Sequence, residues 1–158
     1  MSIVTTTVTI NAAFLEEIKE DDRRLRHLLT EARAAFAQRR YRRGWLIRTV
    51  ALLCDLRDQL ALHFTLEESY GYFDEPICAA PWLSERAEAL RSQHRDLFIQ
   101  MCEIVDRAER SLEPHARRTR LNNVSDRFDE FLAALEQHEA DETDLIFQAY
   151  NDDIGVGD

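Results

Sequence analysis

Glycine and proline, the residues that most often interrupt helices, are scarce in this chain: its 158 residues include four glycines and three prolines. Two of the glycines stand near the C-terminus. The other interruptions fall at three places, around Gly44, between Gly71 and Pro81, and at Pro114. Uninterrupted stretches rich in Ala, Leu, Glu and Arg favour helices. We therefore expect four helices, at roughly residues 11–38, 44–73, 83–112 and 114–150.

Each of these segments carries apolar residues at the spacing of an amphipathic helix. In the last segment, for example, Val124, Phe128, Phe131 and Leu135 follow this spacing. Helices of about 28 residues would be about 42 Å long, and short connections make successive helices antiparallel. The sequence therefore predicts an all-α fold, an up-down-up-down antiparallel four-helix bundle.

The length of the chain limits the number of domains, and its net charge limits the kinds of binding partner. The length fits one domain, residues 1–158, in which we expect residues 1–10 to form an N-terminal arm and residues 151–158 a flexible acidic tail. Twenty Lys and Arg against thirty Asp and Glu give a net charge of −10, which argues against nucleic acid or an anionic membrane as partner. No apolar run approaches the roughly 18 residues of a membrane span, and the N-terminus lacks the pattern of a signal peptide, so we expect a cytoplasmic protein.

Three histidines interrupt the apolar stripes. His63, His94 and His138 lie in the middle of the stripes of the second, third and fourth segments. Glu67 follows His63 by four residues and Glu142 follows His138 by four, and such positions share one face of a helix. If the helices alternate in direction, the three histidines fall about 15–18 Å from the same end of the bundle. We therefore expect them to share one layer.

The first segment places Asp22 at the same height, with Asp21 on the other flank of the apolar face as the alternative. A buried layer of three imidazoles and three carboxylates is costly without a cation, and these groups suit iron, manganese or zinc. Six ligating side chains are too many for one four-coordinate zinc site, so we predict two metal ions. About three or four coordination positions would remain for an oxo or hydroxo bridge and an exogenous ligand. The predicted ligands are Asp22, His63, Glu67, His94, His138 and Glu142.

Three segments carry a resemblance to a known family. Leu56 to Glu68 reads Leu-x-x-x-Leu-x-x-His-Phe-x-x-Glu-Glu, His94 lies in Ser-Gln-His-Arg-Asp-Leu, and Leu135 to Glu142 reads Leu-Glu-Gln-His-Glu-Ala-Asp-Glu. Over residues 14–149 the chain resembles the hemerythrin-like HHE cation-binding domains.

The resemblance implies a four-helix bundle that holds a non-heme di-iron centre. It implies that Glu67 and Glu142 bridge the two iron ions and that the three histidines are terminal ligands. Asp22 departs from the pattern, because the family usually has histidine there within a run like Asp-His-x-x-Leu-Arg. Phe98 also departs, because oxygen-carrying hemerythrins have a second histidine at that position of the third helix. The five-histidine set of the oxygen carriers is therefore incomplete.

We predict a protein that binds two iron ions, with manganese or zinc as alternatives, and that binds or senses O2, NO or iron. Two other functions stay open. The same centre would suit a di-iron enzyme that reduces peroxide or oxygen. If the metal site is degenerate, the chain would instead be a helical interaction module.

Arginines concentrate toward the end of the bundle away from the proposed metals. A solvated face is the simpler explanation, and a docking surface for an acidic protein partner is the alternative. The arginines concerned are Arg39, Arg40, Arg42, Arg43, Arg117, Arg118 and Arg120.

Overall fold

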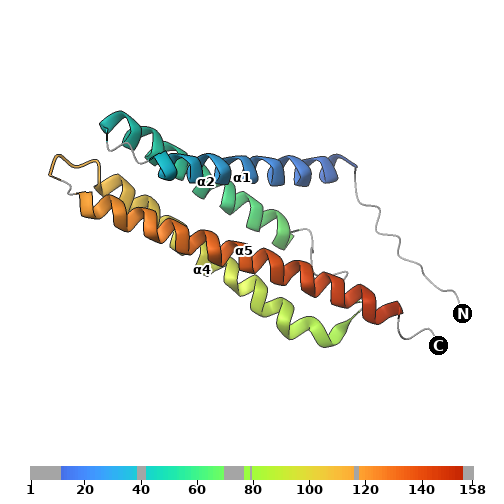
Figure 1. The fold of residues 1–158 in the computed structure, drawn as a ribbon. Coiled ribbons are helices and arrows are strands. Elements are labelled where there is room, and N and C mark those ends of the chain that lie inside the picture. The colour runs from blue at the N-terminus through green and yellow to red at the C-terminus, as the bar shows by residue number, and fades with distance from the viewer. Residues whose placement is uncertain (1–11, 39–41, 70–76, 79, 116–117, 155–158) are drawn as a thin grey trace, which may run out of the picture.

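The structure, a computed structural model, describes residues 12–38, 42–69, 77–78, 80–115 and 118–154. These residues form four long α-helices and a short 3-10 helix, and they include no strand, which confirms the all-α prediction (Figure 1). The elements are α1 (Ala12–Gln38), α2 (Arg43–Ser69), η1 (Pro81–Leu83), α4 (Ser84–Arg110) and α5 (Arg118–Ile154).

The helix boundaries follow the predicted ones within a few residues, except at the C-terminal end. There α5 continues to Ile154, so residues 151–154 are helical and do not belong to a flexible tail as predicted. The helix continues because no glycine or proline occurs before Gly155. The predicted arm at residues 1–10 and the tail residues 155–158 lie outside the described residues.

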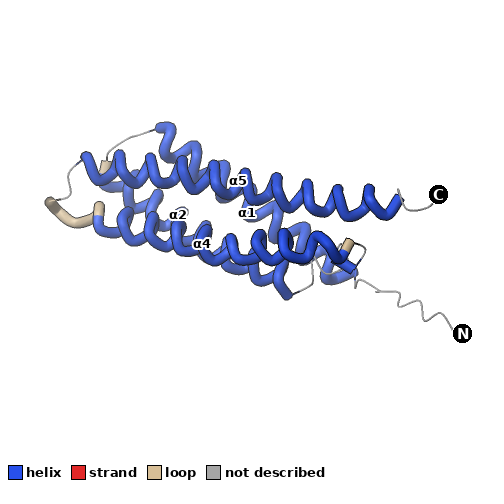
Figure 2. The backbone as a smooth tube through the Cα atoms, turned by 90° about the horizontal axis from the view of Figure 1, so that it is seen from below, coloured by secondary structure: helices blue, strands red, loops and turns tan. Residues whose placement is uncertain are grey.

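The four long helices pack in chain order. The α1 helix packs against α2, α2 packs against α4, and α4 packs against α5. Figures 1 and 2 show the four helices side by side, with the first turns of α1 and the last turns of α5 toward the same end of the molecule. Within the described part of the chain, no helix has the length and apolar character needed to cross a bilayer.

A polar layer divides the hydrophobic core into two parts. The larger part extends along α4 from Leu97 to Ala108 and along α5 from Val124 to Leu135. The smaller part consists of Ala87, Leu90 and Leu145. Between the two parts lie the buried side chains of His94, His138 and Glu142. Apolar side chains, packed by the hydrophobic effect, therefore enclose this polar layer from both sides.

The predicted arginine cluster is described only in part. Arg42, Arg43 and Arg120 are exposed, whereas Arg39, Arg40 and Arg117 lie outside the described residues. Arg118 begins α5. The docking surface for an acidic partner therefore stays a prediction.

We expect the Phe128→Ala variant to lose about 3–5 kcal/mol of unfolding free energy, because it leaves a cavity in the larger part of the core. Phe128 is fully buried, and its ring centroid lies 4.9 Å from that of Phe36. Phe147→Ala is the matched control, since Phe147 is 65% exposed and its loss should cost about 0.5 kcal/mol or less. Urea unfolding followed by circular dichroism measures both, and equal losses would contradict this picture of the core.

Candidate metal centre

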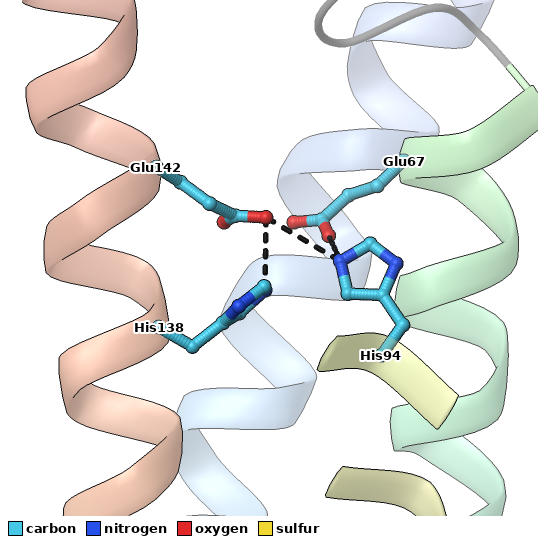
Figure 3. A group of neighbouring side chains, drawn as sticks. All are labelled: Glu67, His94, His138 and Glu142. Carbon is cyan, nitrogen blue, oxygen red and sulfur yellow. Dashed lines mark hydrogen bonds and ion pairs between the residues drawn. The ribbon is translucent and has the colours of Figure 1, made fainter. Parts of the chain in front are cut away.

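Four side chains from three helices converge in the polar layer. Glu67 of α2, His94 of α4, and His138 and Glu142 of α5 each offer one ligand atom, and these atoms all lie within 4.8 Å of one another (Figure 3). The side chain of His138 is 2% exposed, that of His94 is 4% exposed, and Glu67, the most accessible, is 12% exposed. Water is therefore largely excluded from the space between them.

Two helical i, i+4 pairs build most of this cluster. In α2, His63 Nε2 lies 2.9 Å from Glu67 Oε1, and in α5, His138 Nε2 lies 2.9 Å from Glu142 Oε1. One helical turn separates the members of each pair, so both members point to the same side of their helix.

His94 joins the two pairs. Its Nε2 lies 3.1 Å from Glu67 Oε2 and 3.4 Å from Glu142 Oε1. Glu67 thus turns one carboxylate oxygen toward His63 and the other toward His94. The sequence predicted that these five residues share a layer, and the structure brings all of them together.

The outer nitrogen of every imidazole in the layer has its own partner. Asp21 lies 2.7 Å from Nδ1 of His63, Glu68 lies 3.1 Å from Nδ1 of His94, and Gln93 lies 2.9 Å from Nδ1 of His138. Each partner presents an oxygen, so in neutral imidazoles Nδ1–H donates to it and Nε2 keeps its lone pair for the interior. This orientation, with Nδ1 held from outside, is typical of metal-ligating histidines.

Two polar atoms in the layer have no hydrogen bond. They are Glu67 Oε2 and His138 Nε2, both buried, although each has a charged or polar neighbour close by. A cation held between the carboxylates and imidazoles would satisfy both atoms, so the residues present fit a metal ion.

The close contacts change the acidity of three of these side chains in the metal-free protein. Burial lowers the pKa of His63 and His94, but the neighbouring carboxylates outweigh it and raise both pKa values to about 9. Burial raises the pKa of Glu67, but its contacts with the two histidines outweigh it and lower the pKa to about 2. Without metal, the layer is therefore held by ion pairs.

The structure does not place Asp22 in the layer, where the sequence predicted it. Asp22 lies 3.3 Å from Arg26 on the same helix, and its side chain is 48% exposed. Asp21, the alternative, is buried instead and contacts His63. The reason is the phase of α1, whose buried face includes Leu28 and leaves Leu29 only partly buried.

Three neighbours of the centre were not identified from the sequence. They are Gln59, which binds Asp21, and the outer partners Glu68 and Gln93. Gln59 carries a usable signal, because it precedes His63 by one helical turn and so shares its face. Glu68 and Gln93 carry none, because each reaches a histidine on another helix.

The remaining histidines do not take part. His27 lies on the surface of α1, 3.4 Å from Glu31, and its side chain is 68% exposed. His115 is exposed and lies beyond the C-terminal end of α4. Phe98, at the position where oxygen carriers have a histidine, packs against the larger part of the core.

No protein-family model, curated protein or solved structure matches this chain. The resemblance to the hemerythrin-like domains therefore stays a prediction from the sequence.

We expect the metal-free protein to be most stable between pH 4.5 and pH 6.5. Stability from the raised pKa values of His63 and His94 is fully present below pH 6.5 and is lost as the pH rises through about 9. Stability from the lowered pKa of Glu67 is present above pH 4.5 and is lost as the pH falls through about 2.

Thermal unfolding in a chelator, measured from pH 4 to pH 10, tests this dependence. His94→Gln should weaken the alkaline decline, because it removes one of the two titrating imidazoles. His27→Ala, the exposed control, should leave the decline unchanged. A wild-type melting temperature that is constant from pH 6.5 to pH 9 would contradict the ion-paired layer.

Proposed function

We propose that this chain is a non-heme di-metal protein, with two iron ions as the expected cofactor, that binds or senses O2, NO or iron itself. One observation carries the proposal. Three imidazoles, each held at Nδ1 from outside, turn Nε2 toward two buried carboxylates, and two atoms of this layer lack a hydrogen bond. Such an arrangement is costly in a core unless a cation occupies it.

The hemerythrin-like architecture is part of this proposal. The packing order of the helices and the short connection between α1 and α2, residues 39–42, support an up-down-up-down bundle. The sequence patterns around His63, His94 and His138 support membership of the family.

The donor set consists of three imidazole nitrogens and two carboxylates. Glu67 would help to hold the ions, since its two oxygens face different histidines, His63 and His94. The α4 and α5 helices would contribute the other ligands, which are His94, His138 and Glu142. Mixed nitrogen and oxygen ligands suit iron, manganese and zinc, and iron in such a set supplies open coordination positions for a small ligand.

The aromatic surroundings keep the centre dry. The ring of Phe64 stacks on His94 with a centroid distance of 4.2 Å, and it meets His138 edge-on at 6.1 Å. Phe64 is itself 5% exposed. The low local dielectric around these buried rings strengthens every electrostatic contact of the layer.

A surface hollow lies between α1 and α5, beside the helix that carries His138 and Glu142. It has a volume of about 540 Å³ and lies between Arg26 of α1 and Glu139, Ala140 and Thr143 of α5. Glu139 adjoins His138 in the chain, and burial raises its pKa.

Metal content tests the proposal. The purified wild-type protein should hold about two metal ions per chain, measured by elemental analysis. His94→Ala should bind metal more than about tenfold more weakly, because even outer partners of a ligand contribute that much. His27→Ala should keep the wild-type content, and a His94→Ala variant that does the same would overturn the proposal.

Optical spectra of the iron-loaded protein separate the functions that remain. A spectral change with O2 or NO and no turnover supports ligand binding or sensing. Repeated turnover of peroxide would indicate a di-iron enzyme instead. Absence of bound metal would indicate a helical interaction module.

A further inference from the structure

Asp21 links α1 to the polar layer. It is 6% exposed, although neighbouring residues of the same helix turn, such as Asp22, reach solvent. Its Oδ2 lies 2.7 Å from Nδ1 of His63, and its Oδ1 accepts a 2.6 Å hydrogen bond from Nε2 of Gln59. Both oxygens of this carboxylate are therefore engaged by side chains of α2.

The geometry separates Asp21 from the ligand atoms. Asp21 contacts Nδ1 of His63, whereas Nε2 of the same ring lies 2.9 Å from Glu67. The two nitrogens lie on different sides of the imidazole, so Asp21 stands behind His63 as seen from the carboxylates. Asp21 is also not among the four residues whose ligand atoms lie within 4.8 Å of one another.

We propose that Asp21 is a positioning residue that accepts the Nδ1–H of His63, fixes the tautomer whose Nε2 lone pair faces Glu67, and makes this imidazole a stronger metal ligand. Gln59 holds the carboxylate in place through its other oxygen. This inference rests on the proposed metal-binding function, and it assigns α1 an indirect role in the centre in place of the ligand predicted at Asp22. An outer carboxylate of this kind raises the basicity of a ligating histidine.

The outer partners of the three histidines differ in strength. Glu68 is also a carboxylate, but its side chain is 47% exposed, so water screens its charge. Gln93 is neutral. The side chain of Asp21 is only 4% exposed. Among the three partners, Asp21 therefore has the strongest effect on its histidine.

Cobalt titration of the metal-free protein tests the role, with Co²⁺ alone as the probe and its visible absorption as the signal. Asp21→Ala should weaken Co²⁺ binding by about 10–100-fold. It should also shift the cobalt absorption bands at saturation, because His63 becomes a weaker donor. Asp22→Ala is the matched control, since it removes a neighbouring carboxylate that does not touch the layer, and it should bind like the wild type with unchanged bands.

Two further variants keep the test decisive. Asp21→Asn preserves the size of the side chain but removes its negative charge, so its affinity should lie between those of the wild type and Asp21→Ala. Gln59→Leu removes the hydrogen bond that holds Asp21 and should weaken Co²⁺ binding by a smaller factor, and it replaces Asp21→Ala as the test if that variant does not fold.

The outcomes distinguish this inference from the proposed function. If the wild type does not bind Co²⁺, the proposed function itself fails. If the wild type binds and Asp21→Ala matches Asp22→Ala in affinity and bands, only the positioning role is overturned. Lower stability of metal-free Asp21→Ala with unchanged affinity and bands would make Asp21 a structural residue and would also overturn the role.

Discussion

Ionisable side chains enclosed between two apolar parts of the core are the constraint on which this structure depends. His94, His138 and Glu142 are almost fully buried, and His63 and Glu67 are nearly so. A charge in such surroundings is tolerated only when it is paired or bound to a cation. Ordinary packing would place leucines in this layer at lower cost, so the layer indicates a function.

The metal-free and metal-bound forms would satisfy this constraint in different ways. With pKa values near 9, His63 and His94 are protonated at neutral pH, and they pair with Glu67, which is ionised. A ligating imidazole must be neutral at Nε2, so metal binding has to displace these protons. Protons and metal ions would therefore compete for one set of side chains.

Each helix contributes to the layer according to its position. The α2 and α5 helices each supply a histidine and a carboxylate one turn apart, and α4 supplies the histidine that contacts both carboxylates. The α1 helix supplies Asp21, which touches the layer only from outside. Asp22, also on α1, does not belong to this arrangement.

The sequence by itself determined the helices and the layer. Scarce glycine and proline set the helix boundaries, and the 3.6-residue period placed His63, Glu67, His94, His138 and Glu142 on inward faces. Only the tertiary structure decided between Asp21 and Asp22, because adjacent residues differ by about 100° around a helix and both flank the apolar stripe. It also decided the outer partners Glu68 and Gln93, because each reaches a histidine on a different helix. Such contacts depend on how the helices rotate against one another, which a one-dimensional period does not specify.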